Sequence, residues 1–199
     1  MIGKPIQYQP LTQLEVDEAC RKHEFLMNGR MGGARANFSY KILKGLDLSG
    51  RNLADADLSG AILEGTNFSG ANLTRATIFA ADMRQANLSG AVLHRADMRG
   101  VILRGADLTG ADLSNAHIGG SDLDLAYLLG ANLTGTTYLG ATTGAAYYDA
   151  STDFTNAYSY DFAVSPLFDP VVAGWIFVPE PSGALLMGLG LAGLASRRR

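Results

Sequence analysis

The sequence is poor in the residues that build disulfide frameworks and basic binding faces. It holds one cysteine, Cys20, which excludes an intramolecular disulfide. Residues 105–196 contain nine acidic residues and no lysine or arginine, whereas residues 1–104 contain 13 basic and 10 acidic residues. Since no strongly basic face is indicated, nucleic acid is not expected as a partner.

Recognisable catalytic and metal-binding patterns are also missing. His23, His94 and His117 do not have the spacing of metal ligands. No Ser/His/Asp arrangement or nucleophile elbow is found, and the glycines at 188–193 match the dinucleotide fingerprint without the strand that should precede them. Cys20 and His23 could form a reactive pair, but packing on an apolar helix face is favoured. We therefore predict no enzyme, no catalytic residue, no cofactor and no metal.

What the sequence has in abundance is one five-residue word, repeated 21 times without insertion from Ala36 to Gly140. The centre of each word is large and apolar, and from Ala56 to Ala131 the residue two places earlier is alanine in 13 of 16 words. These two residues of each word are expected to point inward. The predicted core ladder contains Leu58, Leu63, Phe68, Leu73, Ile78, Met83, Leu88, Leu93, Met98, Leu103, Leu108 and Leu113.

A period of five fits neither the 3.6-residue helix nor the two-residue strand. A chain that turns a corner once per word would close a four-sided coil of 20 residues, and stacked coils would pair their backbones. At strand spacing, about five coils give a rod of ~25 Å. The fold class predicted for residues 36–140 is therefore an all-β solenoid.

Words such as Ala56-Asp57-Leu58-Ser59-Gly60 and Ala86-Asn87-Leu88-Ser89-Gly90 resemble the A(D/N)LXX repeats of the pentapeptide-repeat family. The resemblance covers 105 of the 199 residues and implies a right-handed quadrilateral β-helix. Members of this family do varied things, so the resemblance does not define a function.

Both ends of such a rod need covers. Residues 1–35 are predicted to hold a lead and a capping helix at 12–28, because Thr12 and Glu15 have the form of a capping box and Gly29 suits a C-cap. Residues 141–177 are predicted to be a C-terminal cap, because 138–177 contain ten of the 17 aromatic residues. A site for an aromatic ligand or a sugar is the alternative at this end.

The rod surface carries three notable columns or clusters. Glycines at 50, 70, 90, 110 and 130 indicate a corner that favours a residue without Cβ. Isoleucines at 42, 62 and 102 could form a binding stripe, although tolerated apolar variants are favoured. Five arginines, at 75, 84, 95, 99 and 104, could bind phosphate, although a solvated surface of mixed charge is favoured.

The tail consists of Val178, Pro179, Glu180, Pro181 and Ser182, an apolar segment at 183–195, and then Arg197, Arg198 and Arg199. This order resembles a PEP-CTERM sorting tail. The resemblance implies recognition by an exosortase, cleavage near the Pro-Glu-Pro motif, and delivery to the envelope or matrix of a Gram-negative bacterium. A buried C-terminal helix is the alternative to a short apolar helix that enters the membrane.

The tail normally requires an export signal, and Met1–Pro10 shows neither a basic nor an apolar signal region. The apolar segment would span only ~20 Å as a helix, against a bilayer core of ~30 Å. The hypotheses are a gene start further upstream, or a protein that stays in the cytoplasm uncleaved.

The function predicted is a non-enzymatic structural or interaction module, sorted to the cell envelope or extracellular matrix, with an unidentified protein partner. The alternative is a cytoplasmic DNA mimic that binds a topoisomerase. That role needs a strongly acidic rod, and 36–140 holds ten acidic and eight basic residues.

Overall fold

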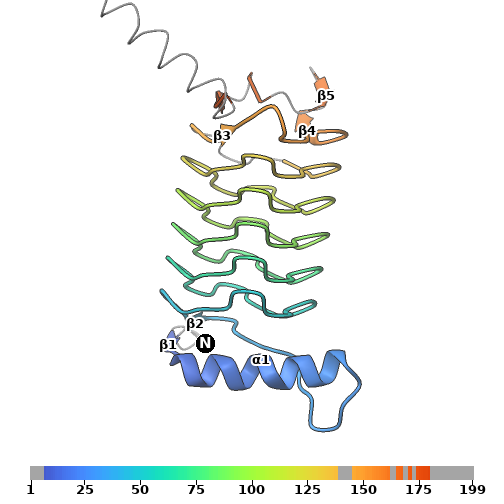
Figure 1. Ribbon diagram of the computed structural model, residues 1–199. Helices are drawn as coiled ribbons and strands as arrows, with labels where there is room; N and C mark the ends of the chain where they lie inside the picture. Colours follow the sequence, from blue (N-terminus) through green and yellow to red (C-terminus); the bar gives the residue numbers. More distant parts are fainter. Residues whose placement is uncertain (1–6, 139–144, 162–164, 168–169, 172–173, 180–199) are drawn as a thin grey trace, which may run out of the picture.

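The computed structural model describes residues 7–138, 145–161, 165–167, 170–171 and 174–179. Short extended segments stack as coils into a rod, with one helix lying across the N-terminal end (Figure 1). Helix α1 spans Gln13–Met27. The strands are β1 (Gln9–Pro10), β2 (Lys41–Ile42), β3 (Tyr147–Tyr148), β4 (Tyr158–Asp161), β5 (Ser165–Leu167) and β6 (Ile176–Phe177).

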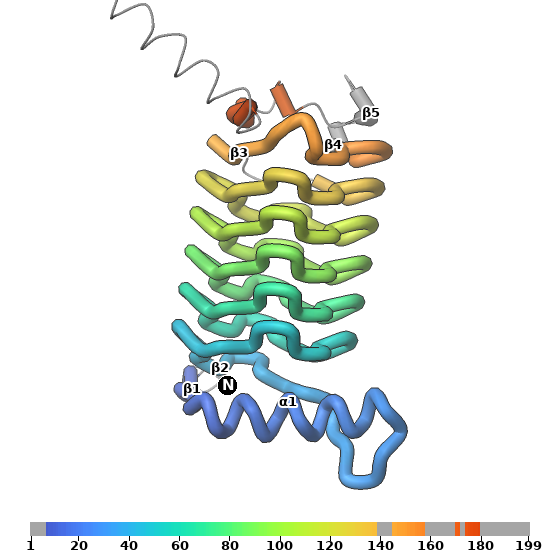
Figure 2. The backbone as a smooth tube through the Cα atoms, in the orientation of Figure 1, coloured from blue at the N-terminus to red at the C-terminus, as the bar shows by residue number. Residues whose placement is uncertain are grey.

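Parallel bridges join residues twenty apart along the rod, from Asn37–Asp57 at one end to His117–Thr137 near the other. The bridges fall into four columns, so four words make one coil, and the column that begins at Asn37 passes through five successive steps. The coils follow one another without a change of direction (Figure 2). The prediction of a solenoid built from stacked coils is therefore confirmed.

The A(D/N)LXX word is explained by its backbone donors. In the word 86–90, the first N–H bonds the preceding word, the second bonds the coil before, and the third and fifth bond the coil after. The fourth, from Ser89, is accepted by Asn87 Oδ1 at 3.0 Å. Asp57, Asn72 and Asp112 make the same bond in their words. The Asp or Asn side chain therefore accepts the one backbone N–H of each word that has no backbone partner.

The fifth residue of every word from 40 to 135 has a positive φ. Twelve of these twenty residues are glycine, with the column at 50, 70, 90, 110 and 130 between 62° and 66°, as the sequence predicts. The other eight residues have a Cβ, for which the left-handed conformation is sterically unfavourable. They are Tyr40, Asp55, Arg75, Ala80, Gln85, Arg95, Asn115 and Leu125.

The core of the rod is one continuous apolar cluster, to which every word contributes its centre. Every centre from Phe38 to Leu133 is fully buried, including all twelve residues of the core ladder named above. Three polar residues occupy small inward positions, and each donates to a backbone carbonyl: Thr66 Oγ1 to Leu43 O at 2.8 Å, Ser121 Oγ to Met98 O at 2.7 Å, and Thr136 Oγ1 to Leu133 O at 2.7 Å. These three inward hydroxyls are therefore all paired within the core.

Helix α1 closes the N-terminal end. Its N-cap is Thr12, which forms a capping box with Glu15, and Gly29 follows the C-cap with φ 64°. Val16 and Cys20 on α1 are fully buried and belong to the same apolar core as the coils. Strand β1 pairs in parallel with β2, which places the lead beside the first coil. The helix is one residue shorter at each end than the 12–28 read from the sequence.

The coils continue beyond Gly140, where the word is no longer visible in the sequence. Tyr127 bridges to Tyr147 at the usual spacing of twenty, but Asn132 bridges to Asp153, 21 residues on. One extra residue after Tyr147 therefore shifts the phase and hides the last words. Strand β3 pairs in parallel with β6, which adds another layer, and β4 pairs antiparallel with β5.

Candidate functional site

The arginine cluster of the middle coils is mostly neutralised by ion pairs. Arg75 contacts Asp55 at 2.6 Å on the coil before, Arg84 contacts Asp82 at 2.6 Å, and Arg99 contacts Asp97 at 2.7 Å. Arg104 contacts Asp124 at 3.2 Å. Hydrogen bonds from these guanidinium groups hold the pKa values of Asp55, Asp82 and Asp97 below their usual range. A charged patch with its own counterions is a poor phosphate site.

The histidines and the cysteine lie in separate, structurally occupied places. His23 is buried and its Nδ1 accepts the Ala36 N–H at 3.0 Å. His94 Nδ1 lies 2.8 Å from Ser114 Oγ, and His117 Nδ1 lies 3.3 Å from Thr137 Oγ1. Burial raises the pKa of Cys20 to about 11. The thiol is therefore neutral at physiological pH and has packing as its role.

Among the described residues, no cluster of three or more His, Cys, Asp or Glu has the arrangement of a metal site. The same part of the chain contains no helix with the length and apolar character needed to span a bilayer. The segment 183–195, which the sequence proposes for the membrane, lies outside the described residues.

Aromatic rings close the C-terminal end of the rod. Trp175 is 5% exposed and lies edge-on to Tyr138 and Phe154, at centroid distances of 6.1 and 5.5 Å. Tyr148 meets Phe154 at 5.7 Å and Phe177 at 5.5 Å, again edge-on. Burial raises the pKa of Tyr138 far above its usual range, so this phenol stays neutral. The rings fill the end of the core and contact one another.

A second set of apolar side chains faces outward at the same end. Tyr127, Tyr147 and Ile176 occupy one column of the coil ladder, and the rings of Tyr127 and Tyr147 stack at 5.0 Å with 15° between their planes. We call this surface the apolar strip. It consists of this column and its chain neighbours Leu125 and Leu129. In the four tiers before it, the column carries Asp47, Asn67, Asn87 and Asp107.

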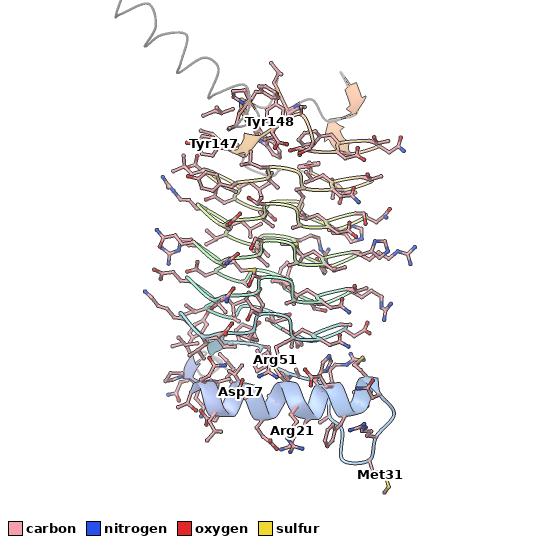
Figure 3. All side chains as sticks on the ribbon, in the orientation of Figure 1. Asp17, Arg21, Met31, Arg51, Tyr147 and Tyr148 are labelled. Atoms are coloured by element: carbon pink, nitrogen blue, oxygen red, sulfur yellow. The ribbon has the colours of Figure 1, made fainter. Side chains whose placement is uncertain are left out.

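The sorting motif begins directly on the end of the rod. Ile176 N–H bonds Ala146 O at 2.7 Å and Val178 N–H bonds Tyr148 O at 2.6 Å. Val178 is half-buried and Pro179 is exposed (Tyr147 and Tyr148 are labelled in Figure 3). Glu180, Pro181 and Ser182, and the arginines at 197–199, lie outside the described residues.

Stacked four-word coils and a ladder of buried centres place the chain among the solenoid repeat proteins. A model of pentapeptide repeats matches eight copies within residues 34–137, more than half of the chain. The chain belongs to the pentapeptide-repeat family. A second match, to the PEP-CTERM protein-sorting motif, covers residues 177–199. That motif points to processing by an exosortase and to sorting to the cell envelope or the extracellular space.

Several solved structures are similar to the chain. QnrB1, a plasmid-mediated fluoroquinolone resistance protein, is 18% identical over 78% of this chain and 89% of its own, with a TM-score of 0.45. A pentapeptide repeat protein from Nostoc PCC 7120 is 24% identical over 86% of this chain and 99% of its own, with a TM-score of 0.35. Another, from the thylakoid lumen of Arabidopsis thaliana, is 31% identical over 60% of this chain and 68% of its own, with a TM-score of 0.30.

None of the curated proteins compared with the chain matches it.

The apolar strip was not identified from the sequence, although a signal exists. In the word 126–130, Tyr127 and Leu129 occupy positions that most other words fill with polar residues. The apolar surface column predicted from the sequence is that of the isoleucines at 42, 62 and 102. Of these, Ile102 is 39% exposed and Ile42 and Ile62 are half-buried. The column is interrupted by Asp82, whose carboxylate binds Arg84.

Proposed function

We propose that the protein is a non-enzymatic structural or interaction module that is delivered to the cell envelope or extracellular matrix and processed there at its tail. The observation that carries this proposal is the junction of two parts. A rod whose polar side chains mainly serve its own coils ends at β6, and the match to the sorting motif begins at Phe177, the last residue of that strand.

The surface chemistry of the rod supports an interaction role. Its Asp and Asn side chains accept backbone N–H groups, and its arginines are largely paired with carboxylates. Cys20 and His23 are both buried on the inner side of α1, while His94 and His117 lie on different words. A long, regular surface of this kind suits contact with another macromolecule over many tiers.

The proposal includes a division of the chain. Residues 1–35 form the lead and capping helix, 36–140 the right-handed quadrilateral β-helix, 141–177 the C-terminal cap, and 178–199 the sorting tail with a short apolar helix. An exosortase would act on the Pro-Glu-Pro motif, 183–195 would enter the membrane, and the terminal arginines would hold the C-terminus on the cytoplasmic side.

Binding to a topoisomerase as a DNA mimic is the competing function, and the ion pairs on the middle coils weigh against it. A DNA mimic must present unpaired negative charge. Here the carboxylates of Asp55, Asp82 and Asp97 are each paired with the guanidinium group of a different arginine. A supercoiling assay with purified protein at micromolar concentration is expected to show no inhibition. Salt-sensitive inhibition would favour the mimic.

The decisive experiment follows the fate of the tail. The gene is expressed with its upstream region in a host that has an exosortase, and the mature protein is recovered from each cell fraction for mass spectrometry of its C-terminus. We expect an exported product that lacks the terminal arginines. An exported product that still ends in Arg199 would refute processing, and a Pro179→Ala/Pro181→Ala variant provides the matched uncleaved control.

A further inference from the structure

The C-terminal end of the rod carries an apolar surface that the family assignment does not explain. Tyr127 is 45% exposed, Ile176 42% and Leu125 38%. Three tiers of one face are involved, and the tier before them presents Asp107 at the same column position. A contiguous apolar surface bounded by polar residues is typical of a binding site.

We propose that the apolar strip lies against the headgroup region of a lipid bilayer while the tail is in the membrane. The inference rests on the proposed function, because it takes the segment 183–195 as membrane-inserted. It adds that the folded rod itself contacts the lipid, at the edge where the strip meets the C-terminal end.

The length of the spacer supports this contact. Only Pro179–Ser182 separate the anchored Val178 from the apolar segment. Four residues in an extended, proline-rich conformation span ~12 Å at ~3.1 Å each. A bilayer interface is of the order of 5–8 Å deep on each side of the hydrocarbon core. With 183–195 inserted, the end of the rod therefore cannot stand far from the headgroups.

The chemistry of the strip fits an interface better than the hydrocarbon core. Tyrosine has an apolar ring and a polar tip, and tyrosine is enriched where membrane meets water. Tyr127 and Tyr147 present two stacked rings, with Ile176 on the next tier. The strip itself contains no lysine or arginine, and Arg104, which reaches the residue beside Leu125, is paired with Asp124 at 3.2 Å, so the strip offers no unpaired cation for anionic lipid. The partner we infer is therefore zwitterionic lipid such as phosphatidylcholine.

The test uses Trp175, the only tryptophan in the sequence, which immediately precedes Ile176. Full-length protein is bound to phosphatidylcholine vesicles with brominated lipids, which quench nearby indole fluorescence, and binding is measured separately by flotation. We expect flotation with quenching. For Tyr127→Asn combined with Tyr147→Asn, which restores the amide found in lower tiers, we expect flotation with weaker quenching, because the spacer still keeps the end of the rod near the membrane but the strip no longer lies against it. Equal quenching in the two proteins would overturn the strip contact. Leu14→Asn, at a 78% exposed leucine on α1, is the control and should leave both unchanged.

The outcomes separate the two hypotheses. Flotation of the unsubstituted protein without quenching of Trp175 would overturn the strip contact and leave the sorting proposal standing. Absence of flotation would overturn both the inserted tail and the contact. If sedimentation without lipid shows a dimer that the double substitution dissociates, the strip is a contact between two copies and the inference is wrong.

Discussion

The two ends of the rod are closed by different chemistry. At the N-terminal end, α1 is attached by polar contacts: Gln13 Nε2 donates to Asp47 O at 2.7 Å, Gln13 Oε1 accepts the Asp47 N–H at 2.8 Å, and Arg51 pairs with Asp17 at 2.7 Å (Figure 3). At the C-terminal end, rings around Trp175 and the short pairing of β3 with β6 close the core.

The difference distinguishes an end of the rod that is covered by a helix from an end at which the tail leaves the rod. The helix covers the first coil. The large apolar residues exposed near it are dispersed over α1, with Leu14, over the loop that follows it, with Met31, and over the edge-on pair of Tyr8 and Tyr40 at 6.4 Å. At the other end, Tyr127, Tyr147 and Ile176 align in one column, and the sorting motif leaves from the same place. At both ends apolar side chains complete the core, but the C-terminal end, where the tail leaves the rod, also aligns exposed apolar side chains in one column, as a contact surface does.

The largest effect is expected in the middle of the rod, which serves as the reference for both ends. Leu88→Asp would place a carboxylate in the core, where an unpaired charge costs several kcal/mol or more, so we expect loss of the folded state. Leu88→Ala should cost ~2–5 kcal/mol. Circular dichroism during urea denaturation measures both.

Ser89→Asp is the neighbouring control for Leu88→Asp. Ser89 is only half-buried, and its N–H would still reach Asn87, so its effect should be far smaller. Equal loss of stability in Leu88→Asp and Ser89→Asp would contradict the inward register of the core ladder.

Trp175→Ala tests whether the C-terminal end of the rod unfolds independently of the rest. Loss of a buried aromatic ring costs ~3–5 kcal/mol, and here the cost should fall on the last layer. We expect hydrogen exchange to accelerate at the amides of Ile176 and Val178, which bond the coil end, while the amides of α1 keep their protection. Equal acceleration in α1 would mean that the two ends unfold as one unit.

Gln13→Ala makes the corresponding change at the N-terminal end. It removes two hydrogen bonds to the backbone of Asp47, but both sites are exposed and water can replace the side chain. A net loss of ~1 kcal/mol is expected. Gln13→Glu would turn a carboxylate oxygen toward the Asp47 carbonyl and the Asp17 carboxylate, which the Gln13 amide now donates to, so it should be more destabilising than Gln13→Ala in denaturant titrations. A loss as large as that of Trp175→Ala would contradict the assignment of the N-terminal contacts as weaker ones.

The sequence predicted the coils well because each word repeats the same local chemistry. The large centre, the small residue before it and the Asp or Asn between them are sufficient to define the inward register and the side-chain bond to the fourth N–H. The eight non-glycine corner residues show that the stack imposes a positive φ even where the residue disfavours it. Propensity alone would not place Leu125 in that conformation.

The C-terminal end could not be predicted in the same detail. The extra residue after Tyr147 breaks the period, so Thr152, Asp153 and Phe154 do not read as a word although Asp153 accepts the Thr155 N–H at 2.8 Å. Pairing between Tyr147 and Ile176 joins residues 29 apart, and no local pattern specifies such a contact. Side chains that meet only through this pairing, such as Tyr148 and Phe177, were predicted as a cap but without their contacts.

The smallest expected effect is a pH dependence that arises at the N-terminal end. Burial lowers the pKa of His23 from its usual value, and the charge of Arg35 acts in the same direction, while Asp55 and Glu24 oppose it. The buried ring accepts the Ala36 N–H through Nδ1, which requires the neutral form at that atom. The unfolded chain binds a proton below a pKa of about 6.5, whereas the folded chain resists it. The free energy of unfolding should therefore be constant above about pH 6.5 and fall as the pH decreases through the folded pKa. Asp55, Asp82 and Asp97, whose pKa values are also lowered, act at lower pH because carboxylates titrate there.

Urea denaturation between pH 7.5 and 5 therefore measures the contribution of the histidine to the free energy of unfolding. In His23→Gln, an amide oxygen can accept the same N–H without titrating, so the decline over this interval should disappear. If His23→Gln retains the full decline, the proton binds elsewhere and the N-terminal end has no part in it.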